Sequence, residues 1–529
     1  MAENGAYQRT GKSLRNSAVA LLLQIIQLLL GFFSRKIFLD YLGTEVLGLN
    51  STASSLLNFL NLAELGIGNA VAFSLYRPIF SQDNKTIREI VALQGWLYRR
   101  VALFVIGASV VAMFFFPMIF TKMELPMSYA YASFAVLLLS SMLGYFVNYK
   151  QVVLTADQKD YKVQLSFRLT MIVKVAFQMA AVAFLPHPYL WWLIFEALFA
   201  IIAAILLDRT VHREYPFLRG RVKVARRALP TATGEGEEVV TLDKYPDILS
   251  KIKQLFIHKI GFYATVQITP LLIYAFTSLS LVAIYGNYLV LSNSLNALLL
   301  ALFASITASV GNMIAEGDGK LIMKVFRELF TSRFYLMAFS SVILWFLAEP
   351  FIEIWIGPQY LLSRRTLLLI ILNFYLTGMY VVMEIYINAC GLFRDVWATI
   401  AQVIVYLTLA LVLGHYMGLD GVLLAGVIQL VLLTVLWRPY FLFRHGIMQP
   451  VVRYWLLYGK LLLAGGAAIA AGTLILSLLP QPDGTVLSFV LYAVEVCVIF
   501  ALLLFGALYA AERGMRTFVE RIFRTVSHR

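Results

Sequence analysis

The chain has 529 residues, of which 60% are hydrophobic and only 14% are charged. A water-soluble protein of this length cannot keep so much apolar surface out of solvent, so the composition excludes that class and favours a bundle embedded in lipid. The net charge of +14 would suit nucleic acid only on a soluble basic face, which the sequence lacks, so we expect no nucleic-acid partner.

Fourteen apolar segments are each long enough to cross a bilayer, which takes about 20 residues per helix. In lipid the backbone polar groups must be satisfied within each segment, so the segments are predicted to be α-helices. The expected spans are residues 16–40, 45–76, 90–117, 128–155, 161–184, 188–210, 251–276, 280–314, 325–348, 366–390, 396–416, 419–443, 455–478 and 486–511.

Lys and Arg are distributed unequally between the two sides of the predicted bundle. With the N-terminus inside, nearly all of them fall on the cytoplasmic side, including Arg333 and Arg438, whereas the outer loops hold only Lys122, Arg364 and Arg365. This is the positive-inside pattern. It predicts a multi-pass plasma-membrane protein with both termini in the cytoplasm.

The longest stretch without a predicted span divides the chain. Residues 214–250 are polar and rich in Gly and charge, as is typical of a flexible cytoplasmic connector. The segments that start at Val46 and Val282 resemble each other, which is consistent with two parallel repeats of a transporter. We therefore expect an N-terminal bundle of six helices (1–213), the connector (214–250), a second bundle of six (251–445), and two further helices with a basic tail (446–529).

Polar residues interrupt the first two helices in stripes. On the first helix the stripe consists of Gln24, Gln27, Gly31, Ser34 and Arg35, and on the second of Asn50, Ser54, Asn58, Asn61, Glu64 and Gly68. Burying polar groups in hydrocarbon costs free energy, so each stripe must face protein or a wet cavity. The alternative reading is that the uncharged members only hold helices together.

Charged residues within the spans are the candidate functional residues, because each costs at least ~2.5 kcal/mol at the bilayer centre. Several cations that face one cavity would suit an anionic, phosphate-bearing substrate. The candidate substrate-binding residues are Arg35, Lys174, Lys259, His258, Gln27 and Asn58. Snorkelling is the alternative role for Arg35, and a core position is the alternative for His258.

Two carboxylates on polar helix faces, Glu64 and Glu384, are candidates for coupling transport to a proton or sodium gradient. For Glu384 the alternative is a structural ion pair, with Lys259 or Lys174 as its partner. No bound cofactor or metal is expected. The sequence has no P-loop, no HExxH and no Cys/His cluster, and the outer loops PHPY, HYMGLDG and PQPDG are too short for a polymerase or ligase site, so we expect a protein that is not an enzyme.

Four stretches carry a family resemblance. The run SRKIFLDYLGTEVLGLNSTASSLLNFLNLAELGIGNAV, the motif LTADQKDY, the motif WIGPQYLLS, and NACGLFRDVW followed by GLDGVLLAGVI resemble the bacterial polysaccharide and O-antigen flippases of the multidrug/oligosaccharidyl-lipid/polysaccharide (MOP) exporter superfamily. The resemblance implies an all-α polytopic fold of about 14 transmembrane helices, with two six-helix bundles in a V and two C-terminal helices. It also implies an acidic residue in the seventh helix, where this chain has Gln267-Ile268-Thr269-Pro270.

The resemblance further implies a function. The expected activity is alternating access that moves an undecaprenyl-pyrophosphate-linked oligosaccharide from the cytoplasmic to the outer leaflet of the bacterial inner membrane. Membrane lipids and the polymerase or export machinery of a surface polysaccharide are the expected partners. A drug/cation antiporter of the same superfamily and a membrane polysaccharide polymerase or ligase remain the alternatives.

Overall fold

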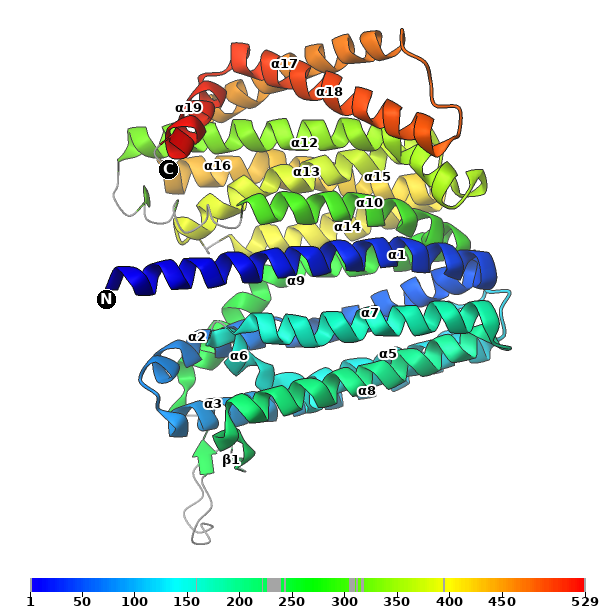
Figure 1. Cartoon of the computed structure of the whole chain (residues 1–529), viewed down its shortest axis with the longest axis vertical. Coiled ribbons are helices and arrows are strands. Elements are labelled where there is room, and N and C mark those ends of the chain that lie inside the picture. Colours follow the sequence, from blue (N-terminus) through cyan, green and yellow to red (C-terminus); the bar gives the residue numbers. More distant parts are fainter. Residues whose placement is uncertain are drawn as a thin grey trace. The chain divides into compact units, whose positions relative to one another are not determined.

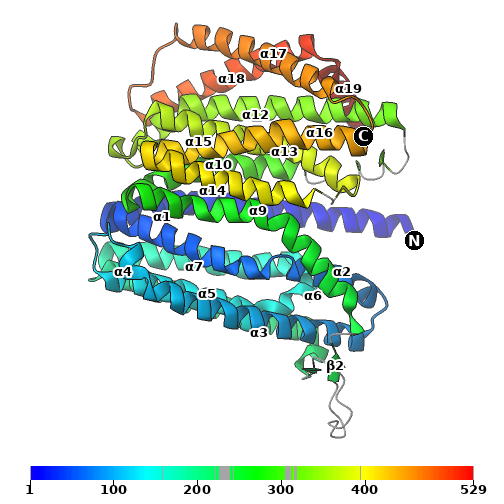
Figure 2. The same ribbon diagram turned by 180° about the vertical axis from the view of Figure 1, so that it is seen from behind.

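A computed structural model gives the fold. It describes residues 2–157, 159–220, 222–225, 239–241, 244–303, 310, 313–314, 318–392 and 395–527. Side chains are described between residues 26 and 521, with gaps that include residues 257–259. The chain forms two compact units, Met1–Ala283 and Ile284–Arg529, each built from helices (Figures 1 and 2).

The first unit is helical apart from one short pair of strands. β1 (Lys223–Ala225) and β2 (Val239–Thr241) run parallel, with Val224 opposite Val240. Its helices are α1 (Ala2–Leu60), η1 (Asn61–Glu64), α2 (Ile67–Phe80), α3 (Asn84–Phe114), α4 (Phe116–Ile119), α5 (Met127–Phe146), η2 (Asn148–Gln151), α6 (Val152–Ala156), α7 (Asp160–Phe184), α8 (Pro188–Glu214), η3 (Pro216–Arg219) and α9 (Pro246–Phe276).

The second unit begins within α10 and is helical throughout its described residues. Its helices are α10 (Leu279–Phe303), α12 (Gly319–Trp355), η5 (Pro358–Tyr360), α13 (Arg364–Ala389), α14 (Val396–Met417), α15 (Leu419–Leu430), η6 (Val431–Trp437), α16 (Arg438–Leu442), η7 (Phe443–Ile447), α17 (Val452–Leu476), α18 (Val486–Ala511) and α19 (Arg513–Ser527). The segments η6 and η7 are π-helical, so the helix that follows α15 is locally widened.

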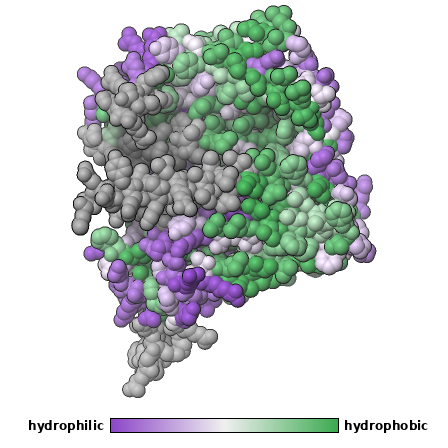
Figure 3. All heavy atoms as spheres, in the orientation of Figure 1, coloured by the Kyte–Doolittle hydropathy of each residue, from purple (hydrophilic) through white to green (hydrophobic). Residues whose placement is uncertain are grey.

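Ten helices within the described ranges are long and apolar enough to cross a membrane, and a bent pair made of Ile26–Glu64 and Ile67–Phe80 is an eleventh candidate. The bent pair contains most of the first two expected spans. Helix α9 covers the seventh expected span, and α10 covers residues 280–303 of the eighth. Among the coloured residues in Figure 3, hydrophobic ones gather in a broad central region, and hydrophilic ones lie mainly toward the edges. The prediction of an all-α polytopic membrane protein is confirmed.

The first helical element is broken at Gly43, in the short gap between the first two expected spans, 16–40 and 45–76. Gly43 has φ of +78°, a backbone conformation that L side chains rarely adopt, and the chain turns back at this point (Figure 1). A second break follows at η1, where Gly66 has φ of +91° and the helix axis bends by 41°. The second expected span is therefore not one straight helix.

Close backbone contact joins the second half of α1 to the start of α10. A Cβ atom added at Gly48 would lie 1.8 Å from the carbonyl oxygen of Leu279. The Thr44 hydroxyl lies 3.1 Å from that of Ser280 in the same region. The absence of a side chain at Gly48 is thus what allows these two backbones to touch.

The second unit is built around α12, which packs against α13, α17, α18 and α19. Its core is rich in aromatic residues. Phe326 is fully buried and meets Tyr386 and Phe443 edge-to-face, with ring centroids 5.2 Å apart in both pairs. Figure 2 shows α17 and α18 side by side as a pair.

Two arginines that the charge pattern assigns to the cytoplasmic side are buried by the protein. Arg333 is fully buried, about 21 Å along α12 from its start, and its Nε donates to the Gly378 carbonyl oxygen at 2.9 Å. The Arg438 side chain is 12% exposed and pairs with buried Asp395 at 3.3 Å. Neither arginine is a loop residue, and counting charges along the chain cannot distinguish a loop arginine from one that protein oxygens satisfy. On which side of the membrane they lie stays a prediction.

The Gly48 contact predicts a stability difference between two glycines of one helix. Gly48→Ala places a methyl group against the Leu279 backbone, which cannot yield as a flexible side chain can, so we expect a loss of about 1–3 kcal/mol or more. Gly31→Ala is the control, because a Cβ there meets nothing within 4 Å. Thermal unfolding of the purified protein should show a lower midpoint for Gly48→Ala only. Equal midpoints for the two variants would contradict the contact.

Candidate functional site

An intramembrane ion pair lies in the first unit, between α7 and α8. The Lys174 ammonium contacts both carboxylate oxygens of Glu196, at 2.8 and 3.0 Å. The Gln178 amide donates to the same carboxylate at 3.0 Å and to the Trp192 carbonyl oxygen at 3.1 Å. Lys174 is therefore charge-compensated within its own unit by Glu196. The pairing of Glu384 with Lys174 or Lys259, an alternative from the sequence, stays a prediction.

Gln27 and Asn58 have different surroundings. The Gln27 amide lies 3.3 Å from the Met171 sulfur, one helical turn before Lys174 on α7. This contact brings the stripe of the first helix next to the Lys174–Glu196 pair. Asn58 is exposed on α1, away from the core of the unit.

Arg35 lies half-buried on α1, one turn before Leu39 and Phe38 enter the core. Its Nη2 donates to the Ala283 carbonyl oxygen at 3.2 Å, in the first turns of α10. Its neighbour Lys36 is directed elsewhere and pairs with Asp40 one turn on, at 3.9 Å, with both side chains about half exposed. Arg35 is thus held against backbone oxygen, and Lys36 is a surface residue.

Asn50 shows how the uncharged members of the stripes are used. Its side-chain oxygen accepts from the Ser133 hydroxyl at 2.6 Å and from the Tyr189 hydroxyl at 2.8 Å. These contacts tie α1 to α5 and α8. The contacts of Asn50 thus support the alternative interpretation of the stripe, in which its uncharged residues hold helices together by hydrogen bonds.

Glu64 lies at the second helix break, among hydroxyl and amide groups. The Asn61 amide exchanges hydrogen bonds with Ser141 at 3.0 and 3.3 Å, and its oxygen accepts from Tyr145 at 2.9 Å. The Tyr145 hydroxyl also interacts with the Glu64 carboxylate, and the rings of Tyr145 and Tyr98 meet edge-to-face at 5.6 Å. We call this group (Asn61, Glu64, Tyr98, Ser141 and Tyr145) the helix-break cluster.

The geometry of the break suits ion binding. Where η1 ends, the helical hydrogen-bond ladder is interrupted and Gly66 takes a left-handed conformation. Interrupted membrane helices leave backbone carbonyls available to a cation, and transporters place ion sites at such points. Buried Gln94 lies beside Tyr98, and within the described structure its side-chain oxygen has no hydrogen-bond partner. The cluster therefore combines a half-buried carboxylate with further oxygen atoms at a broken helix.

Glu384 lies in a regular part of α13 and is exposed. The nearby buried polar group is a different one, which the sequence interpretation did not pick out. Asp395 accepts from the Trp437 indole at 3.0 Å and pairs with Arg438, whose Nη2 lies 3.3 Å from the Thr399 hydroxyl. This network fixes the end of the π-helical segment η6 to the start of α14.

Two predicted site residues cannot be placed. The backbone of His258 and Lys259 belongs to α9, but their side chains lie outside the described residues. Their role in substrate binding stays a prediction. Of the remaining cationic candidates, Arg35 and Lys174 lie on α1 and α7, two helices that pack against each other.

The LTADQKDY motif forms a structural corner at the start of α7. Asp157 accepts from the Lys159 ammonium at 2.8 Å and from the Tyr215 hydroxyl at 2.5 Å. Burial acts to raise the pKa of Asp157, but these hydrogen bonds outweigh it and hold the pKa below its ordinary value. Lys159 and Lys162 both pair with Glu214, at the end of α8. The motif therefore joins two helices through charges.

Solved structures with the same fold come from two kinds of transport protein. An inward-facing multidrug resistance MATE family transporter of the MOP superfamily matches with a TM-score of 0.60 and 13% identity, over 80% of this chain and 98% of that one. The lipid II flippase MurJ, in an inward closed conformation, matches with a TM-score of 0.60 and 14% identity, over 93% of this chain and 100% of that one. A MATE protein in a bent conformation matches with a TM-score of 0.52 and 13% identity, over 82% and 94%.

These likenesses define a class of fold. No protein-family model matches the sequence, and no curated protein matches it either. At 13–14% identity the structural matches show the fold alone, which is that of multi-pass MOP transporters and flippases. Within this class, the match to the lipid II flippase extends over more of the chain than either MATE match does.

The Lys174–Glu196 pair predicts that one single substitution is worse than a double one. Lys174→Met leaves the partly buried Glu196 carboxylate without its cation, which should cost about 1–3 kcal/mol. Lys174→Met combined with Glu196→Leu removes both charges and should recover most of that loss. Thermal unfolding in detergent measures the difference. A double variant no more stable than Lys174→Met alone would show that the pair does not stabilise the unit.

Proposed function

We propose that this protein is a flippase, which moves a polyprenyl-pyrophosphate-linked oligosaccharide from the cytoplasmic to the outer leaflet by alternating access. The observation that carries the proposal is the extent of the structural match. The fold of the lipid II flippase accounts for 93% of the chain, whereas the MATE match with the same TM-score accounts for 80%. The additional helices α17 and α18 are integral to the second unit, since both pack on α12.

The charge of the candidate residues supports an anionic substrate. Arg35 provides a planar guanidinium on α1, and such a group matches phosphate oxygens in two parallel hydrogen bonds. Lys174 contributes less net charge, because Glu196 compensates it. Arg35 is therefore the first candidate for binding the substrate headgroup. Lys174 and Gln27 lie on the neighbouring surface. Lys259 and His258 are further candidates.

The alternative is an antiporter of cationic drugs. The inward-facing MATE transporter matches this chain with the same TM-score as the flippase, so the fold alone suits either function. A cationic substrate requires a cavity with negative charge, which Arg35 opposes. Transport assays with both classes of substrate distinguish the two functions.

The first test is direct transport by the purified protein in liposomes. A fluorescent polyprenyl-pyrophosphate disaccharide should become accessible on the opposite leaflet in the presence of the wild-type protein. Arg35→Ala should slow this by about ten-fold or more, and Arg35→Lys should recover it only in part, because an ammonium lacks the bidentate fork. Lys36→Gln is the control, since it also removes one positive charge but from an exposed pair.

The outcomes separate the candidate functions. Wild-type protein that transports a cationic dye and leaves the lipid in place would overturn the flippase proposal in favour of the antiporter. Lipid transport by Arg35→Ala at the wild-type rate would keep the flippase but remove Arg35 from headgroup binding. In cells, removal of the protein should lead to accumulation of the lipid-linked intermediate on the cytoplasmic side.

Energy coupling is proposed to act through Glu64 rather than Glu384. Glu64 belongs to the helix-break cluster, where a cation or proton would meet hydroxyl, amide and backbone oxygens, whereas Glu384 is exposed on a regular helix. Glu64→Gln should therefore leave transport that no longer responds to an imposed pH or sodium gradient. Glu384→Gln is the matched control and should keep the response. Gradient-dependent transport by Glu64→Gln would exclude this role.

A further inference from the structure

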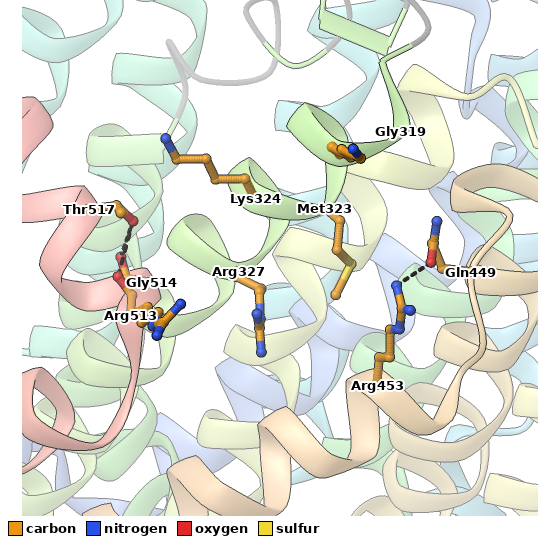
Figure 4. A pocket seen from close by; sticks show the side chains of 10 residues that line it. Gly319, Met323, Lys324, Arg327, Gln449, Arg453, Arg513, Gly514 and Thr517 are labelled. Carbon is orange, nitrogen blue, oxygen red and sulfur yellow. Dashed lines mark hydrogen bonds between the residues drawn. The ribbon is translucent and has the colours of Figure 1, made fainter.

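A basic pocket opens at one end of the second unit, where α12 and α17 begin and α18 ends. Its volume is about 400 Å³. Figure 4 shows the side chains that line it, which are Gly319, Lys320, Met323, Lys324, Arg327, Gln449, Arg453, Arg513, Gly514 and Thr517. Five of these ten residues are Lys or Arg, and none is acidic.

Three elements supply the cations. Lys320, Lys324 and Arg327 follow one another at three- and four-residue steps, so they lie on one face of α12. Arg453 comes from the first turn of α17 and is directed by a hydrogen bond from its Nη1 to the Gln449 side-chain oxygen (Figure 4). Arg513 comes from the start of α19.

The wall formed by α19 is firmly attached. A Cβ at Gly514 would lie 2.8 Å from the Arg327 carbonyl oxygen, so α19 touches the α12 backbone there. Arg516 folds back to donate to the last carbonyls of α18, those of Tyr509 at 2.8 Å and Ala510 at 2.9 Å. Arg521 pairs with buried Glu328 at 2.8 Å. The pocket is therefore a built feature of the unit and not a gap beside a loose tail.

The positive charge of the pocket is only partly compensated. Buried Glu512, the residue between α18 and α19, contacts Arg327 at 3.5 Å and Lys460 at 3.3 Å, so it already pairs with two cations. Within the described residues, Lys320, Lys324 and Arg513 form no ion pair. Like charges gathered around a small volume repel one another, and a bound polyanion would relieve that repulsion.

We propose that this pocket binds the phosphate-bearing headgroup of an anionic membrane lipid. Arg and Lys side chains are the groups that bind phosphate oxygens, and basic pockets between helices at the cytoplasmic surface suit anionic headgroups. The charge distribution of the sequence predicts that this end is cytoplasmic. The pocket shares no residue with the transport site proposed above. The lipid-binding proposal therefore does not depend on which substrate is transported.

The surroundings favour a lipid over a soluble phosphate compound. Next to Arg453 in the first turns of α17, Val452, Trp455 and Leu456 are 54%, 40% and 69% exposed. They form an apolar surface that starts at the pocket and continues along a membrane-spanning helix, where acyl chains would lie. A lipid could thus place its headgroup in the pocket and its acyl chains along this apolar surface. A free phosphate would gain nothing from this surface.

The experiment compares lipid retention by the full-length protein and two charge variants. Native mass spectrometry counts bound phosphatidylglycerol and, separately, zwitterionic phosphatidylcholine. The pocket variant carries Lys324→Gln, Arg453→Gln and Arg513→Gln, which spare Arg327 and its contact with Glu512. The control variant carries Arg77→Gln, Arg209→Gln and Arg444→Gln, which remove the same charge from exposed positions outside the pocket. Equal thermal midpoints establish that the variants are folded.

The expected result is that the pocket variant retains phosphatidylglycerol at least about ten-fold more weakly than the wild type, with phosphatidylcholine unchanged. The control variant should behave as the wild type does. Equal phosphatidylglycerol retention by the pocket and control variants would overturn the proposal. A second arm adds inorganic pyrophosphate: if it stabilises the wild type but not the pocket variant, and phosphatidylglycerol shows no such difference, the site takes a soluble anion and the lipid assignment is wrong.

Discussion

A charged side chain inside hydrocarbon has to find its partner within the protein, and this requirement organises both units. Lys174 is satisfied by Glu196, Arg438 by Asp395, and Arg333 by the Gly378 carbonyl oxygen. The first contact joins α7 to α8, the second joins α16 to the start of α14, and the third joins α12 to α13. Because leaving one partner unpaired costs several kcal/mol, these charges fix which helices can be neighbours.

Backbone contacts and breaks complete the arrangement. Gly48 lets α1 and α10 touch, and Gly514 does the same for α19 and α12. Gly43 and Gly66 take conformations with positive φ where the chain turns and where the second span bends. The bend also gathers the helix-break cluster around Glu64. Local backbone geometry and the candidate ion site therefore have a common origin.

Much of the fold could be predicted from the sequence, because apolar length and the restriction to helices in lipid are properties of single segments. The turn near Gly43 is an example. The side-chain partners could not be predicted, because they depend on which helices pack together. Glu196 lies in an expected span, but nothing in its spacing connects it with Lys174, and the burial of Arg333 depends on carbonyls of other helices. Glu384 shares a helix face with other polar residues, yet in the structure that face is exposed at Glu384.

The carboxylate of Glu512 has a consequence for how substitutions combine. It pairs with both Arg327 on α12 and Lys460 on α17, and it directly follows α18, so it links three helices. Loss of either cation leaves the other as its partner, whereas loss of both isolates the carboxylate. Their effects on stability are therefore non-additive, and a neutral change on α17 becomes damaging once α12 has changed. Sequence variation at these two positions is consequently constrained as a pair.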